Sequence, residues 1–250
     1  MWLGMKWRSK ITLCVIAFFT GITLTGCTNN TSDTVIFDPY EKTNRKTHAF
    51  NKGLDKAILK PASNTYVAII PRPVVTGVSN FSSNLEIPIM ILNGLLQLDF
   101  EGVSKNTGRF LINSSVGFLG IFDVASSLQI YGKSTDFNET LYTYGVGEGA
   151  YTELPFFSSN TERSAASLIL NFAVNPYQGV FTGAREAIPI SAKVLDLMGK
   201  RHRYSDAIEG ILYDSDDSYS QSRQIYLERM RFSLKGKLES GVYEDPYASD

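Results

Sequence analysis

The chain has 250 residues, a formal net charge of −1 and two cysteines. Residues 1–26 hold three of the 24 basic residues and none of the 25 acidic ones, so the remainder carries a net charge of about −4. This balance lacks the concentrated basic surface that nucleic acids require, which argues against DNA or RNA as a partner. With Cys14 in the apolar start and Cys27 directly after it, no cysteine remains for a disulfide, a metal site or a nucleophile.

The first 27 residues have the pattern of a lipoprotein signal peptide. Three basic residues precede an apolar run over 11–24, and the sequence then reads Leu-Thr-Gly-Cys. In this pattern Cys27 receives a diacylglyceryl group on its thiol, and its new amino terminus is acylated after cleavage. We therefore predict a signal peptide over 1–26, an acylated tether over 27–36 and no other cofactor. The alternative is cleavage at another position, which would leave Cys27 free.

After the tether, apolar residues recur at helical spacing through most of the chain. In 41–59 they follow i, i+4, i+7 and i+8, and Pro61 is expected to end that helix. Pro88 suits the first turn of another helix. One strand is predicted over 141–146, and 236–250 is predicted to be a flexible acidic tail because it has little apolar content. The predicted helices cover 41–59, 62–70, 74–85, 88–98, 101–112, 118–128, 161–173, 184–198, 204–212 and 217–235.

The segment 87–98 is apolar nearly all round. It is too short to cross a bilayer, which takes about 20 residues. It is either a central core helix or a helix that lies in one membrane leaflet. Acylation of Cys27 adds weight to the second interpretation, because the anchor would place the folded part against lipid.

The chain carries a series of motifs in a fixed order. They are Asp38-Pro39-Tyr40-Glu41 with Asn44-Arg45, Phe50-Asn51, Asp55, Lys60-Pro61, Pro71-Arg72-Pro73, 77–88, Asn93, Leu96-Gln97, Arg109-Phe110 with Asn113-Ser114, 117–125, 144–156 and Ser215-Asp216-Asp217-Ser218-Tyr219. This series resembles the MlaA (VacJ) family of outer-membrane lipoproteins, and the resemblance covers nearly the whole mature chain. Two departures are Thr43, where the family commonly has an aromatic residue, and the absence of tryptophan outside the signal peptide.

The resemblance implies an all-α fold over 37–235, a ring-shaped bundle of short amphipathic helices that lie in the membrane plane around a central channel. Such proteins are embedded in the inner leaflet of the Gram-negative outer membrane and associate with a trimeric porin. They remove phospholipids from the outer leaflet and pass them to a soluble periplasmic carrier, MlaC, which serves an inner-membrane ABC transporter. The alternative is a structural, porin-associated lipoprotein without transport activity.

Three groups of residues are candidates for a lipid-transport site. Arg109, Asn80, Asn84, Asn93 and Asn113 are expected either to line a lipid path or to form hydrogen bonds between helices. Arg109 is the stronger path candidate, since a cation suits a phosphate. Gly145, Gly147 and Gly149 form a candidate flexible flap. Asn44, Arg45, Phe50 and Asn51 belong to a candidate gating helix.

The sequence contains no catalytic constellation that we recognise, and we predict that the protein is not an enzyme. The glycines at 145–149 lack the GxGxxG spacing and the following helix of a dinucleotide site. His48 and His202 are far apart in sequence and lack zinc-ligand spacing, so no metal site is predicted. His48 is expected to be a partly buried structural residue, and Asp123 a helix cap or buried hydrogen-bond acceptor.

Overall fold

The computed structural model describes residues 36–174, 177, 185 and 187–239, with side chains as far as 235 in the last helix. The predicted signal peptide, the acylated Cys27 with its tether to residue 35, and the tail over 240–250 lie outside the described residues.

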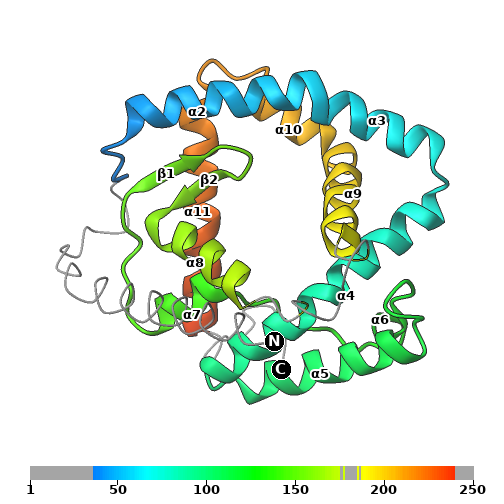
Figure 1. The fold of residues 1–250 in the computed structure, drawn as a ribbon. Coiled ribbons are helices and arrows are strands. Elements are labelled where there is room, and N and C mark those ends of the chain that lie inside the picture. Colours follow the sequence, from blue (N-terminus) through cyan, green and yellow to red (C-terminus); the bar gives the residue numbers. More distant parts are fainter. Residues whose placement is uncertain (1–35, 175–176, 178–184, 186, 240–250) are drawn as a thin grey trace, which may run out of the picture.

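One continuous helical shaft opens the fold. It consists of the α-helix α2 (Glu41–Leu54), the π-helical turn η1 (Asp55–Leu59) and α3 (Lys60–Ile69), which follow one another along the top of Figure 1. The prediction that Pro61 ends the helix is wrong. Pro61 is the second residue of α3, directly after the π-turn, and the helix continues through it to Ile69.

The next helix, α4 (Arg72–Leu96), is also longer than predicted. The sequence suggested two helices separated before Pro88, but Pro88 lies inside a single helix. Its missing N–H removes one helical hydrogen bond. The helix continues because α5 (Phe100–Ser115) and α9 (Ala187–Arg203) both pack along it.

The middle of the chain departs most from the predictions. The helix predicted over 118–128 is a tight turn followed by the short helix α6 (Val124–Ser127), because three successive residues from Phe118 have positive φ. The predicted strand over 141–146 is the end of α7 (Phe137–Thr143) and a turn. The structure has instead an antiparallel hairpin of β1 (Tyr151–Leu154) and β2 (Ser158–Thr161), which the sequence analysis did not predict.

The remaining helices lie close to their predicted ranges. They are α8 (Glu162–Ala173), α10 (Ser205–Leu212) and α11 (Ser218–Glu239). The last of these continues four residues beyond the predicted boundary at 235. A small core is formed by Tyr219, Leu227, Met230 and Leu234 of α11 together with Tyr151 of β1.

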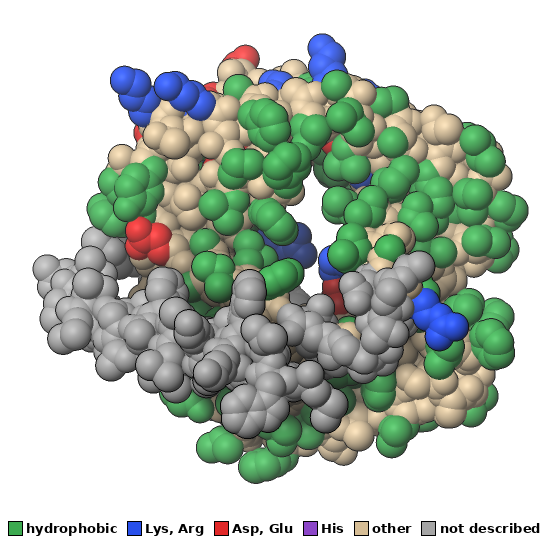
Figure 2. Space-filling view, in the orientation of Figure 1, with side chains coloured by type: hydrophobic (Ala, Val, Ile, Leu, Met, Phe, Trp, Pro, Cys, Tyr) green, Lys and Arg blue, Asp and Glu red, His purple; other side chains and the backbone are tan. Residues whose placement is uncertain are grey.

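The elements form a ring. In Figure 1 the shaft runs along the top, α9 stands on the right, α4 crosses below, and the hairpin with α8 and α11 closes the left side. Figure 2 shows that an opening remains in the middle when side chains are drawn. The mostly helical fold expected from the resemblance is confirmed. Among the described helices, none has both the length and the hydropathy that crossing a membrane would need.

Candidate functional site

Three hollows meet along the segment 132–136, and Ser134 lines all of them. The central hollow, of about 460 Å³, lies between α4 and α9, where Glu86 and Lys193 are among its lining residues. The side hollow, of about 360 Å³, lies between α4 and α5. The α8–α11 hollow, of about 680 Å³, is named for the two helices that supply most of its wall. All three are lined by both polar and apolar side chains.

The side hollow brings together four of the five candidate path residues, namely Asn80, Asn84, Arg109 and Asn113. The two asparagines of α4 hold the turn that follows α5. The Nδ2 of Asn80 donates to the carbonyl of Ile121 at 3.1 Å, and the Nδ2 of Asn84 donates to Ser114 Oγ at 3.1 Å. They line the hollow and also join segments. That the hollow is part of a lipid path stays a prediction.

Arg109 lines the side hollow, but its charge is already matched. Its guanidinium donates to both carboxylate oxygens of Asp123, at 3.1 and 3.0 Å, and to the carbonyl of Ile130 at 2.7 Å. Asn113 also donates to Asp123, at 2.9 Å, and Asp123 caps α6 as predicted. Burial alone would raise the pKa of Asp123, but hydrogen bonds from Ser126, Asn113 and Arg109 outweigh it and lower the pKa to about 2. A phosphate would have to compete with this carboxylate for Arg109.

Asn93 does not line any of the three hollows. It is fully buried, its Nδ2 donates to the carbonyl of Ile89 at 2.9 Å, and its Oδ1 accepts from Thr140 Oγ1 at 2.7 Å. These contacts favour the packing alternative for Asn93. Asn106 was not among the predicted site residues. Its Oδ1 accepts from the N–H of Lys133 at 3.0 Å and its Nδ2 donates to the carbonyl of Lys133 at 2.8 Å, which fixes the segment shared by the hollows.

A polar stripe on α8 was also missed. Ser164, Ser167 and Asn171 line the α8–α11 hollow. Their i, i+3, i+7 spacing was visible in the sequence as a polar face, but nothing in the sequence shows that this face points into a ring rather than toward solvent.

Asn44, a candidate gating residue, attaches the start of α2 to the hairpin. Its buried amide donates to the carboxylate of Asp38 at 2.9 Å and to the carbonyl of Tyr151 at 3.1 Å. Its Oδ1 accepts from the backbone N–H of Glu153 at 3.0 Å. Both the amide nitrogen and the amide oxygen of Asn44 are therefore hydrogen-bonded inside the protein.

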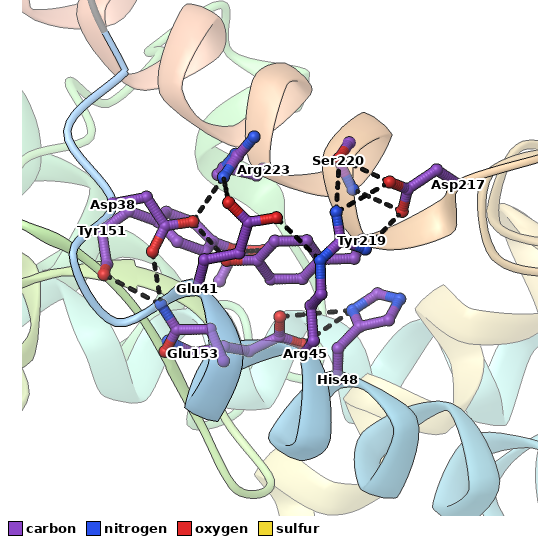
Figure 3. A network of polar contacts seen from close by, with 12 residues as sticks. Asp38, Glu41, Arg45, His48, Tyr151, Glu153, Asp217, Tyr219, Ser220 and Arg223 are labelled. Carbon is purple, nitrogen blue, oxygen red and sulfur yellow. Dashed lines mark hydrogen bonds and ion pairs between the residues drawn. The ribbon is translucent and has the colours of Figure 1, made fainter.

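Arg45 connects the same turn of α2 to the residue just before α11, as Figure 3 shows. Its guanidinium donates to both carboxylate oxygens of Asp217, at 3.0 and 2.9 Å, and to Glu41 at 2.8 Å. The hydrogen bonds from Arg45 hold the pKa of Asp217 well below its usual range. Arg223 of α11 pairs with Asp38, which closes the network.

The other gating candidates, Phe50 and Asn51, contact the hairpin two turns further along α2, and His48 contacts it one turn before them. The buried His48 pairs through Nδ1 with Glu153 at 2.9 Å. Asn51 accepts from the backbone N–H of Phe156 at 2.9 Å, and the ring of Phe50 meets that of Phe156 edge to face at 5.5 Å. The predicted gating helix is thus clamped to the hairpin along one face, and whether it gates remains a prediction.

The candidate flap connects α7 to β1. Gly145 and Gly149 have φ of +80° and +73°, a left-handed backbone conformation that favours glycine. Gly147 does not have a positive φ. The segment is held by Arg163, which donates to the carbonyl of Val146 at 3.0 Å. A flap motion would have to break this bond, and none of the segment's residues lines the three hollows.

The described part of the chain contains no group of three His, Cys, Asp or Glu side chains placed to hold a metal ion. His202 is exposed and its Nδ1 lies 2.9 Å from Asn64 Oδ1, far along the shaft from His48.

Large apolar side chains are exposed at several turns of the ring, and Figure 2 shows many hydrophobic side chains on its surface. Four of them occupy left-handed backbone positions, which cost non-glycine residues about 1–2 kcal/mol each. Leu98, Phe118, Leu119 and Phe156 have φ between 52° and 68° and are 63–72% exposed. The backbone is thus strained where these side chains project outward.

Comparisons with known proteins agree on one family. A family model described as MlaA lipoprotein matches residues 36–233. The Escherichia coli (strain K12) intermembrane phospholipid transport system lipoprotein MlaA is 31% identical over 91% of this chain and 90% of its own length. An uncharacterized protein of Rickettsia prowazekii is 39% identical, and the match covers 62% of each chain. This chain spans about three fifths of the length of four such Rickettsia relatives.

One solved structure has a similar fold over most of the chain. It comes from work described as "Structural basis for maintenance of bacterial outer membrane lipid asymmetry". The TM-score is 0.66 at 28% identity, and the match covers 79% of this chain and 98% of that one.

Proposed function

The chain belongs to the MlaA lipoprotein family, and we propose that it removes phospholipids from the outer leaflet of the outer membrane through its central opening. One observation carries this proposal: three hollows lined by both polar and apolar side chains adjoin one another in a ring whose surface bears exposed apolar side chains. A phospholipid needs both environments, a wet path for its head and apolar surroundings for its tails.

In this proposal the ring sits in the inner leaflet, held by acyl groups on Cys27, with its helices in the membrane plane. The strained apolar turns then enter the acyl region, where each fully buried Leu or Phe side chain contributes about 1.5–3 kcal/mol. That gain offsets the backbone cost of the left-handed positions. The related transport-system lipoproteins support the location in the cell envelope.

The partners proposed are a trimeric porin, the periplasmic carrier MlaC and, through the carrier, an inner-membrane ABC transporter. We propose no reaction chemistry for this protein. In this proposal lipid moves downhill, and its removal by the carrier sets the direction.

The first test is the phospholipid content of the outer leaflet in cells that lack the gene. We expect this content to rise, and to return to normal with the intact protein but not with Cys27→Ala. An unchanged leaflet in the deletion strain, together with intact porin association, would instead support the structural, porin-associated alternative.

A further inference from the structure

Arg229 differs from the other basic residues of the three hollows. Arg109 pairs with Asp123, Lys133 pairs with Asp99, and Lys193 pairs with Glu86. The exposed Arg229 lines the α8–α11 hollow from α11, and it forms no ion pair or hydrogen bond with any residue of the described part of the chain. Among the basic residues that line the three hollows, Arg229 is the one that forms no ion pair within the described part of the chain.

Two more hydrogen-bond donors line the same hollow without a partner among the described residues. Ser233 lies one turn beyond Arg229 on α11, and Asn171 lies at the end of the polar stripe of α8. A guanidinium, a hydroxyl and an amide are the donor types that bind phosphate oxygens. Met230 and Leu234, on the same face of α11, give the hollow apolar surface as well.

Negatively charged side chains line the same hollow from another element. Asp136 and Glu139, at the start of α7, are the two carboxylates among its lining residues. One oxygen of Asp136 caps α7 by accepting from the N–H of Glu139 at 2.9 Å. A hollow with a cation on α11 and carboxylates on α7 suits a head that carries both a phosphate and an amine.

We propose that the α8–α11 hollow binds the zwitterionic head of an amine-bearing phospholipid, with Arg229 as the phosphate ligand and Ser233 and Asn171 as accompanying donors. This assignment rests on the proposed lipid-transport function and names a binding station within it. Asp136 supplies the counter-charge for the amine.

The test uses the full acylated chain in vesicles, with a photoreactive side chain in place of Leu168, an apolar lining residue. The vesicles contain ³²P-labelled phosphatidylethanolamine or phosphatidylglycerol, and the radiolabelled adduct per protein reports occupancy. We expect Arg229→Gln to lower the adduct about tenfold with both lipids, since a hydrogen bond to a charged group is lost, and Arg229→Lys to retain most of it. Asp136→Asn keeps the helix cap and is expected to reduce the preference for phosphatidylethanolamine.

Arg203→Gln is the matched control, because Arg203 is exposed near the end of α9, has no partner among the described residues and lines none of the three hollows. An undiminished adduct in Arg229→Gln, or an equal loss in Arg203→Gln, would overturn the assignment. Loss of the adduct when inorganic phosphate is added at the same concentration as the lipid would also overturn the assignment, because it would indicate a site for free phosphate. Transfer of lipid to acceptor vesicles is measured in parallel. If the wild type transfers lipid and the amount of adduct is the same in Arg229→Gln, only this assignment fails. If the wild type transfers none, the proposed function fails.

Discussion

A buried ion pair closes the ring between the shaft and α9. Asp55 in the π-turn and Arg201 in α9 are 7% and 4% exposed, with Nε–Oδ1 and Nη2–Oδ2 distances of 2.7 and 2.9 Å. Tyr213 also donates to Asp55, at 2.7 Å. Burial alone would raise the pKa of Asp55, but the hydrogen bonds from Arg201 and Tyr213 outweigh it and leave the pKa below its usual value.

Replacing Asp55 with alanine leaves the guanidinium of Arg201 buried without its hydrogen-bonded partner, and only Glu209, at 3.9 Å, remains as a counter-charge among the described residues. Removing one member of a buried pair costs about 3–5 kcal/mol of unfolding free energy. For a domain of this size each kcal/mol corresponds to about 2–4 °C, so Asp55→Ala is expected to lower Tm by about 6–20 °C. The double variant Asp55→Leu, Arg201→Met removes both charges and is expected to recover most of this loss.

The measurement is thermal unfolding followed by circular dichroism, with all variants in the same detergent. Glu101→Ala serves as a control, because it breaks an exposed ion pair with Lys105. We expect Glu101→Ala to leave Tm unchanged. The reasoning is refuted if Asp55→Ala moves Tm no further than Glu101→Ala, or if the double variant unfolds at a lower temperature than the single one.

Three further predictions follow from local geometry. Gly120→Ala places a Cβ 2.4 Å from Asn84 Cβ at φ +91° and is expected to lower Tm, whereas Gly108→Ala, inside α5 with open space around it, should stabilise the fold by about 0.5–1 kcal/mol; equal melting points would contradict this. Because the folded pKa of Asp123 is about 2, below its unfolded value near 3.9, its contribution to stability is present above pH 4 and is lost as the pH falls toward 2. Asp123→Asn should therefore flatten the acid limb of a urea-unfolding series, and an unchanged limb would count against this contribution. Phe118→Ser in the unacylated Cys27→Ala chain is expected to weaken vesicle flotation about tenfold or more, and flotation equal to that of Cys27→Ala alone would show that this turn stays outside the lipid.

The sequence predicted the helical content well but not how the helices divide. Proline is a strong local signal, and it predicts a helix boundary at Pro61 and another at Pro88. In the structure Pro61 lies in the turn after η1, and Pro88 lies inside α4, where α5 and α9 pack along the helix. Neither the π-turn nor this packing can be predicted from the neighbouring sequence. The hairpin was missed because β2 has the sequence Ser-Ser-Asn-Thr, which shows no apolar alternation.

The candidate residues were chosen by type, and type alone does not reveal what a side chain contacts. Arg109 was the expected phosphate ligand, but Asp123, 14 residues later in sequence, already occupies its guanidinium. Arg229 was not singled out, since an arginine in an amphipathic helix ordinarily belongs to a solvated face. Only the three-dimensional arrangement separates a matched cation from an unmatched one.

The π-turn gives the shaft a tolerance that its neighbours lack. Glu41–Ile69 is a single rod roughly 40 Å long at 1.5 Å per residue, with its hairpin contacts at one end and its α9 contacts at the other. A π-turn holds one residue more than the α-helical turn it replaces. Loss of one residue within 55–59 can therefore be taken up by tightening η1 into an α-helix, and the faces at both ends keep their angular relation. The same loss in 60–69 rotates the remaining contacts with α9 by about 100°. The shaft can therefore adjust its length at the same turn from which Asp55 binds Arg201 of α9.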